Sequence, residues 1–113
     1  MGRIVIAAFH PKPGRERDLL AVLNTRLPLL RRLGLATNRE NVTMRAANGT
    51  VLDVSEWVDD SAIERAHSNP EVLQLWKQFD DCCSYVKLDS LLESHDDFAT
   101  FDAIGGDGPL THD

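Results

Sequence analysis

Every residue from Ile4 to Phe9 is apolar, and the run ends at His10-Pro11. Its β-branched members favour an extended strand. Successive side chains of a strand point to opposite faces, so both faces of this strand are apolar. One face carries Ile4, Ile6 and Ala8, and the other carries Val5, Ala7 and Phe9. The chain therefore needs a sheet that is covered on both sides along this strand.

A long helix is predicted after the Pro11-Lys-Pro-Gly14 turn, where apolar residues begin to recur at spacings of three and four. Its apolar stripe consists of Leu19, Leu20, Leu23, Leu27, Leu30 and Leu33. The arginines of this stretch, Arg26 among them, are expected mostly off the stripe. Pro28 removes a backbone donor, so we expect the helix to kink or restart there, and Gly34 to end it.

Two strands joined by a tight turn are predicted next. Residues 41–47 alternate in polarity, and Asn48-Gly49 is a strong signal for a two-residue hairpin turn. Residues 50–58 complete the hairpin, with one face made of Leu52, Val54, Glu56 and Val58. We expect this face to lie beneath the helices, and Trp57 to lie on the other.

Two helices and a last strand complete the predicted elements. Asp59-Asp60-Ser61 is expected to cap a short helix that ends at His67. Asn69-Pro70 then begins a second helix, with a capping residue followed by Pro at the first helical position. Its buried stripe is Val72, Leu73, Leu75, Trp76 and Phe79. Residues 84–91 are predicted to form the last strand.

The resulting order is β-α-β-β-α-β, which is typical of an α+β ferredoxin-like fold with a four-stranded antiparallel sheet and helices on one face. We assign this domain to residues 1–92. Residues 93–113 are predicted to form an acidic C-terminal extension, within which residues 105–109, Gly-Gly-Asp-Gly-Pro, are expected to be disordered.

Helices on one face leave the other apolar face of the sheet open. Exposed apolar patches of this kind usually mark an interface, and a second sheet is the simplest cover. We therefore predict a homodimer that forms through the face of Val5, Ala7, Phe9 and Trp57.

Composition excludes several other classes of partner. A chain of 113 residues suits one domain, and its net charge of -6 argues against nucleic-acid binding. No apolar stretch approaches the roughly 20 residues that span a bilayer. Cys82 and Cys83 are adjacent, which disfavours a disulfide between them and predicts two reduced thiols in a soluble, cytoplasmic protein.

The segment from Ser55 to Val72 reads Ser-Glu-Trp-Val-Asp-Asp-Ser-Ala-Ile-Glu-Arg-Ala-His-Ser-Asn-Pro-Glu-Val. It resembles the strand-helix segment of the antibiotic biosynthesis monooxygenase-like family, and with the element order the resemblance covers residues 3–92. The resemblance implies a dimeric α/β barrel. Known members include cofactor-free oxygenases of quinols or polycyclic aromatics, haem-degrading enzymes and small-molecule isomerases, and many members have no known activity.

The resemblance also implies catalytic roles. In similar proteins a His at the position of His67 faces a cleft between helices and sheet, where a side chain with a pKa of about 6.5 suits a general base. The alternative is a His that contacts free carbonyls at a helix C-terminus. Glu56 is the second catalytic candidate, with a raised pKa if its carboxylate enters the same cleft. Otherwise Glu56 reaches water or pairs with an Arg.

Four further residues are candidates for substrate binding. Trp76, Phe79 and Tyr85 are predicted to form an aromatic wall for a flat ligand, although Trp76 and Phe79 also suit a plain core. His10 lines the mouth of the cleft in this hypothesis, or lies on the surface.

No cofactor is predicted. The sequence has no glycine-rich phosphate loop, and its histidines lack the spacing of metal ligands. Trp76 and His67 do not fall where the haem-degrading members place their Trp and His, and the first strand offers no Asn. The predicted function is a cofactor-independent monooxygenase or isomerase of a small hydroxylated or quinone-like molecule. The alternative is a ligand-binding or structural dimer without catalysis.

Overall fold

A computed structural model describes residues 2–105 of the protein. The disorder predicted for residues 105–109 therefore lies, apart from Gly105, outside the described residues. The strands are β1 (Arg3–Pro11), β2 (Val42–Arg45), β3 (Val51–Trp57), β4 (Cys83–Tyr85) and β5 (Asp102–Ile104). The α-helices are α1 (Glu16–Arg32), α2 (Ala62–His67) and α3 (Pro70–Cys82), and two short 3₁₀ turns follow, η1 (Leu88–Ser90) and η2 (Leu92–His95).

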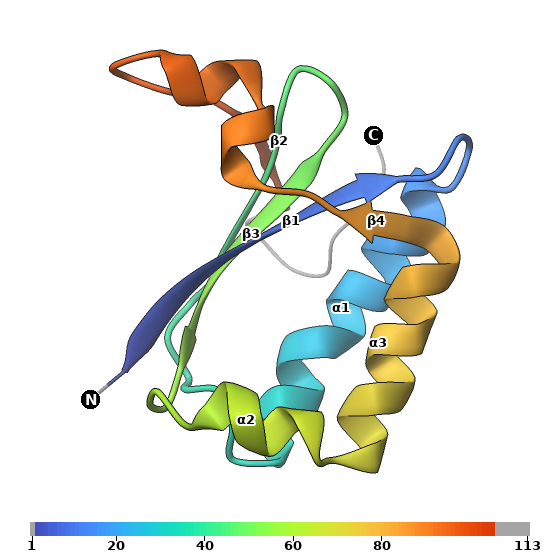
Figure 1. Ribbon diagram of the computed structural model, residues 1–113, viewed down its shortest axis with the longest axis vertical. Coiled ribbons are helices and arrows are strands. Elements are labelled where there is room, and N and C mark those ends of the chain that lie inside the picture. The colour runs from blue at the N-terminus through green and yellow to red at the C-terminus, as the bar shows by residue number, and fades with distance from the viewer. Residues whose placement is uncertain (1, 106–113) are drawn as a thin grey trace.

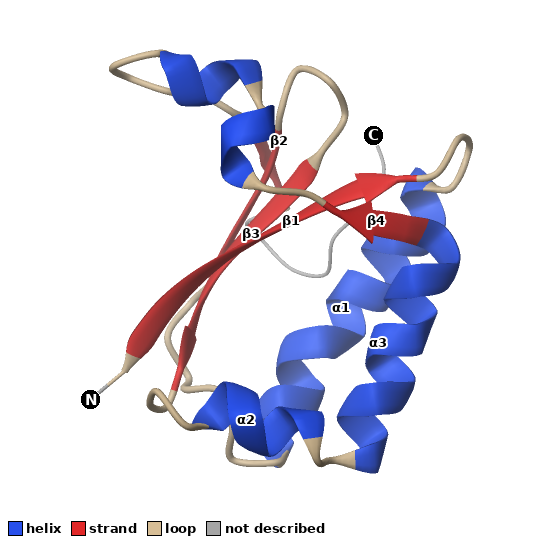
Figure 2. Cartoon of the chain, in the orientation of Figure 1, coloured by secondary structure: helices blue, strands red, loops and turns tan. Residues whose placement is uncertain are grey.

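The strands form one antiparallel sheet in the order β4-β1-β3-β2-β5. The three α-helices lie together on one side of it, and the segment after β4 projects at the end opposite α2 (Figure 1, Figure 2). Residues 2–105 thus form an α+β fold with five strands, and the prediction of four strands is wrong. β5 lies within residues 93–105, where the buried side chain of Ile104 contributes to the core.

The last predicted strand is also shorter than expected. β4 ends at Tyr85, because the chain after Lys87 turns back on itself and the backbone N–H of Ser90 donates to the Lys87 carbonyl. The hairpin prediction is confirmed, since β2 and β3 pair through a turn that contains Gly49 with φ +92°. A side chain at this φ would be strained, which explains the glycine.

The three α-helices lie close to the positions predicted from the sequence. α1 continues through Pro28 as one helix instead of restarting there. The cap of α3 is confirmed, because the side chain of Asn69 accepts hydrogen bonds from the backbone N–H groups of Glu71 and Val72 and Pro70 follows it. Among the described residues, no helix is long and apolar enough to cross a membrane.

The predicted assignment of the two sheet faces is wrong. Phe9 and Trp57, which were expected at a dimer interface, are 1% and 4% exposed and belong to the core beneath the helices. Val5 and Ala7 pack against the same clusters. This face can be buried because the guanidinium of Arg26, on α1, forms an ion pair with Asp53 and so neutralises the charge of that carboxylate beneath the helices. A face that carries Asp53 and Ser55 is polar by sequence but internal in the fold.

The opposite face of the sheet is only partly covered. Ala8 and Leu52 are buried there against Leu91, which lies between the two 3₁₀ turns. Beyond this cover, three large aliphatic side chains of β1 and β2 remain open, with exposed fractions of 56% for Ile4, 45% for Ile6 and 56% for Val42. We call the surface formed by these three side chains the open sheet face.

Candidate functional site

A cavity of about 390 Å³ opens between β1, the ends of β3 and β4, and the helices. Its aromatic lining consists of Phe9, Trp57, Trp76 and Tyr85, and its charged lining consists of Arg26 and Asp80. Val5, Ala7 and Ile63 complete the walls. Mostly apolar walls with a few polar groups are typical of small-molecule sites, and we call this site the aromatic cavity.

The core holds the aromatic lining in place. Phe9 of β1 stacks on Phe79 of α3, with ring centroids 4.7 Å apart and an interplanar angle of 13°. Tyr85 of β4 pairs with Phe9 across the strands and tilts against its ring at 5.4 Å. Phe79 is fully buried and does not line the cavity. Of the predicted aromatic wall, Trp76 and Tyr85 therefore line the cavity, and Phe79 supports it from behind.

His67 lies beside this cavity. Its ring meets the edge of Trp76 with centroids 4.8 Å apart and an interplanar angle of 72°. His67 Nδ1 is 2.9 Å from the carbonyl oxygen of Ile63. A carbonyl only accepts hydrogen bonds, so this contact assigns the proton of the neutral ring to Nδ1 and leaves Nε2 with a lone pair. The side chain is exposed, and the carbonyl contact matches the alternative interpretation of a His at a helix end.

Tyr85 keeps its proton near neutral pH. Burial, followed by the influence of Cys83 and Asp80, raises the pKa of Tyr85 to about 12. The phenol therefore stays a hydrogen-bond donor at the cavity wall, although half of the residue is exposed.

Arg26 is the main residue of the site that sequence reasoning missed. It is 5% exposed, and its Nη1 lies 3.1 Å from Asp53 Oδ2 and 3.3 Å from Ser55 Oγ. Burial lowers the pKa of Arg26, and the charge of Asp53 opposes that shift. The guanidinium remains charged because its ordinary pKa is far above neutral. A signal was present, since Arg26 follows Leu23 by three positions and falls on the buried side of α1.

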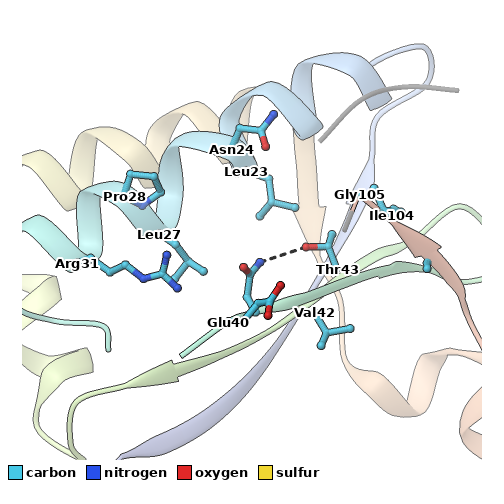
Figure 3. Close-up of a pocket in the computed structure, with 12 residues that line it drawn as sticks. Leu23, Asn24, Leu27, Pro28, Arg31, Glu40, Val42, Thr43, Ile104 and Gly105 are labelled. Atoms are coloured by element: carbon cyan, nitrogen blue, oxygen red, sulfur yellow. Dashed lines mark hydrogen bonds between the residues drawn. The ribbon is translucent and has the colours of Figure 1, made fainter. Parts of the chain in front are cut away.

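Asp53 contacts Arg26 of the aromatic cavity through one carboxylate oxygen and residues nearer the β2 edge of the sheet through the other. Its Oδ1 accepts hydrogen bonds from Asn41 Nδ2 at 2.7 Å and from Thr43 Oγ1 at 2.9 Å. Asn41 and Thr43 also line a second cavity of about 530 Å³ between α1, β2 and β5. Figure 3 shows this second cavity, with Arg31 and Leu27 of α1 across from Glu40.

The second cavity is more polar than the first. Arg31 is anchored there by main-chain acceptors, with Nε 2.8 Å from the carbonyl oxygen of Thr37 and Nη2 2.8 Å from that of Arg39. Gly105, the last described residue, also lines this cavity. None of the predicted site residues lines it.

Glu56 does not share a cleft with His67. It alternates with Trp57 on β3, so its side chain projects from the sheet face opposite the helices. Its carboxylate accepts a 2.7 Å hydrogen bond from Thr37 Oγ1 and pairs with Arg39 Nε at 3.2 Å. These two contacts, led by Thr37, lower the pKa of Glu56, whereas a raised pKa was expected for a catalytic position. Glu56 thus matches the alternative interpretation, in which its carboxylate pairs with an arginine.

His10 lies on the same face as Glu56, at the end of β1. Its Nδ1 is 2.9 Å from Thr50 Oγ1, and it borders a surface depression formed by the turn after β1. The sheet therefore separates His10 from the aromatic cavity. Of the predicted site residues, Trp76 and Tyr85 line the aromatic cavity and His67 contacts Trp76, whereas His10 and Glu56 lie elsewhere.

The position of Glu56 predicts a particular pH dependence of stability. Its pKa in the folded chain lies below the ordinary value of 4.5, so ionised Glu56 stabilises the fold above about that pH. This contribution is lost as the pH falls through the lowered pKa. In thermal unfolding, Glu56→Gln should therefore lower Tm at neutral pH, and the difference from wild type should shrink as the pH falls below 4.5. Exposed Glu64→Gln is the control, and an unchanged difference across this range would contradict the pairing.

Neither a metal site nor a reactive thiol is seen among the described residues. No group of three or more His, Cys, Asp or Glu side chains gathers in residues 2–105 in a way that could hold an ion. Cys82 and Cys83 are buried and unbridged. Burial raises the pKa of both thiols, that of Cys83 to about 12, which disfavours the thiolate.

Comparison with known proteins adds no further constraint. Searches against protein-family models, curated proteins and solved structures give no match to the chain.

Proposed function

We propose that the aromatic cavity binds a small, flat, hydroxylated or quinone-like molecule and that the protein acts on it as a cofactor-independent monooxygenase or isomerase. The observation that carries this proposal is the contact of an imidazole, His67, with Trp76 in the wall of an aromatic-lined cavity, in a tautomer that leaves a lone pair on Nε2. The resemblance to the antibiotic biosynthesis monooxygenase-like family supports the same reaction class.

His67 is the proposed base. Removal of a proton from an acidic CH₂ or phenolic group gives an electron-rich anion, which transfers electrons to O₂ directly. From a CH₂ group, one oxygen atom becomes a carbonyl of the product and the other leaves as water with the two CH₂ hydrogens. From a phenol, the water takes the O–H hydrogen and the hydrogen of the ring carbon that becomes the new carbonyl. In both cases the substrate itself is the reductant. In an isomerisation, the same base returns the proton to another atom of the substrate.

The strand order supports a ferredoxin-like fold as the frame of this site. β4, β1, β3 and β2 are neighbours in that order, with helices on one side, as the β-α-β-β-α-β arrangement requires. We infer that a second copy covers the open sheet face, which completes a dimeric α/β barrel. The unbridged Cys82 and Cys83 fit a reducing compartment such as the cytoplasm.

A ligand-binding or structural dimer without catalysis is the second candidate. This candidate is favoured because His67 is exposed and because Glu56 lies on the opposite face of the sheet, paired with Arg39. The cavity therefore lacks the expected catalytic pair of His67 and Glu56. In this case the cavity would bind its ligand without turnover.

A thermal-shift screen of quinols, naphthols and flavonoid-like phenols tests the first proposal. A ligand at 100 times its dissociation constant stabilises the folded state by about 2.7 kcal/mol, which such a screen detects. Hits are then assayed for O₂ uptake and for product isomers with wild type, His67→Phe and His95→Ala. His67→Phe keeps a ring against Trp76 but removes Nε2, and His95 lies on η2, away from the cavity.

We expect binding by all three proteins and loss of at least about 100-fold in turnover for His67→Phe alone, the usual scale of general-base catalysis. Binding without turnover by the wild type would favour the non-catalytic candidate. The absence of any hit would contradict a site for this ligand class.

A further inference from the structure

The second cavity is lined by one positive and one negative side chain that do not pair with each other. Arg31 reaches into it from α1, and Glu40 lies across from Arg31 on the chain that leads into β2 (Figure 3). Within residues 2–105, neither side chain forms an ion pair. Two opposite charges that face one cavity without neutralising each other favour a ligand that carries both charges itself.

The guanidinium of Arg31 is held by the backbone and keeps a donor for a ligand. Its Nε and Nη2 donate to the carbonyl oxygens of Thr37 and Arg39, both at 2.8 Å. Nη1 forms no hydrogen bond with the described residues and is not one of their buried unpaired atoms, so it retains accessible surface. A guanidinium presents its donors in a rigid fork that suits a carboxylate. Arg31 can therefore bind the carboxylate of a ligand.

The opposite wall of the second cavity offers hydrogen-bond acceptors. Asn41 Nδ2 donates to Asp53 Oδ1 at 2.7 Å and to Thr43 Oγ1 at 3.3 Å. Because an ionised carboxylate only accepts, this contact assigns the amide orientation and makes Asn41 Oδ1 an acceptor. Oδ1 has no donor in the described part of the chain and is not buried. Together with the exposed carboxylate of Glu40, it suits an ammonium group, which has only donors.

The floor of the second cavity is apolar. Leu23 and Leu27 of α1 and Ile104 of β5 are buried in the core, and all three line the cavity. The volume of about 530 Å³ suits a small molecule. The ligand that matches these walls therefore combines a carboxylate, an ammonium group and an apolar side chain.

We propose that the second cavity binds a free α-amino acid with an apolar side chain. The carboxylate of the ligand binds Arg31, and its ammonium group binds Glu40 and Asn41. Its side chain lies against Leu23 and Leu27. The second cavity shares no lining residue with the aromatic cavity among those described, so this inference does not depend on the proposed function.

Analogues that lack one group of leucine at a time test each contact. 4-Methylpentanoate lacks the ammonium group, 3-methylbutylamine lacks the carboxylate, and glycine lacks the side chain. Dissociation constants for these compounds and for leucine, valine and phenylalanine are measured by calorimetry with the full chain, as wild type, Arg31→Gln and Glu40→Gln. Arg17→Gln and Glu64→Gln are the matched controls, since they remove the same charges at exposed positions outside the cavity.

We expect wild type to bind leucine about tenfold more tightly than glycine or more, because the cavity removes the leucine side chain from water. Arg31→Gln should weaken the binding of leucine and 4-methylpentanoate by about tenfold, the scale of a hydrogen bond to a charged group, but not that of 3-methylbutylamine. Glu40→Gln should weaken leucine and 3-methylbutylamine but not 4-methylpentanoate. The controls should bind leucine as the wild type does.

The Glu40 variant keeps the test independent of folding. Arg31→Gln loses two contacts to the backbone, whereas Glu40 is exposed and its replacement by Gln removes only a charge. Leucine binding that Glu40→Gln leaves unchanged would therefore overturn the inference. Binding of 4-methylpentanoate as tightly as leucine would overturn the amino-acid class.

A further variant, Trp76→Phe, tests the location, because Trp76 lines the aromatic cavity and not the second cavity. It should bind leucine as the wild type does, and loss of leucine binding in this variant would overturn the assigned site. If none of the three apolar amino acids binds at millimolar concentration, this inference fails while the proposed function of the aromatic cavity stands.

Discussion

Asp53→Ala is expected to lower the free energy of unfolding by about 3–5 kcal/mol, the usual effect of removing one partner of a buried ion pair. Arg26 is 5% exposed and would keep its charge without a counter-ion. Asn41 and Thr43 would lose the carboxylate oxygen to which both donate. Urea unfolding measures this change, and it should appear as a lower midpoint with an unchanged slope.

The matched control for Asp53→Ala is Asp60→Ala. Asp60 also pairs with an arginine, Arg3, at 2.7 Å, but the two side chains are 82% and 65% exposed. An exposed pair contributes about 0–1 kcal/mol, so this variant should be nearly neutral. The double variant Asp53→Leu with Arg26→Met removes both charges and should recover most of the loss. Equal effects of Asp53→Ala and Asp60→Ala would contradict the buried pair.

The same ion pair explains which part of the fold the sequence could not predict. Strand and helix positions follow from apolar periodicity, and most were predictable within a few residues. The choice of the buried sheet face was not, because β1 is apolar on both faces and the helix-covered face of β3 carries Asp53 and Ser55. Only a long-range contact with Arg26 makes those polar positions internal, and no local pattern indicates such a contact.

The short strands show a second limit of local patterns. β5 has three residues, of which only Ile104 is buried, so it carries no periodicity that could be recognised. Its partner β2 supplies the pairing, at a separation of about 60 residues along the chain. β4 was predicted too long for the opposite reason, since Val86, Leu88 and Leu91 recur between polar residues, as in a strand, through a segment that turns over the sheet.

The candidate site was predictable in part. Aromatic residues at helical and strand spacing indicated Trp76 and Tyr85, and both line the aromatic cavity. Trp57 was placed on the wrong side because its face was misassigned together with that of Phe9. Glu56 was paired with His67 for the same reason. One error about the sheet faces therefore accounts for most of the errors about the site.

Because the two sheet faces were misassigned, the predicted homodimer interface moves to the residues of the open sheet face. The open sheet face exposes Ile4, Ile6 and Val42 on one side of β1 and β2, and a second copy that covers it would bury all three. The wild type should therefore behave in light scattering as twice its chain mass of 12.6 kDa at micromolar concentration. Ile6→Asp should raise the dissociation constant of the dimer by about 100-fold or more, because it buries an unpaired charge in the interface.

Leu73→Asp is the matched control for this prediction. Leu73 lies on α3, on the helical side of the sheet, and its exposed fraction of 45% equals that of Ile6. The two variants thus add the same charge at equally exposed leucine and isoleucine positions and differ in the face that they occupy. Dissociation by Ile6→Asp alone would place the interface on the open sheet face. Dissociation by Leu73→Asp alone would move it to the helices, and a monomeric wild type would contradict the dimer itself.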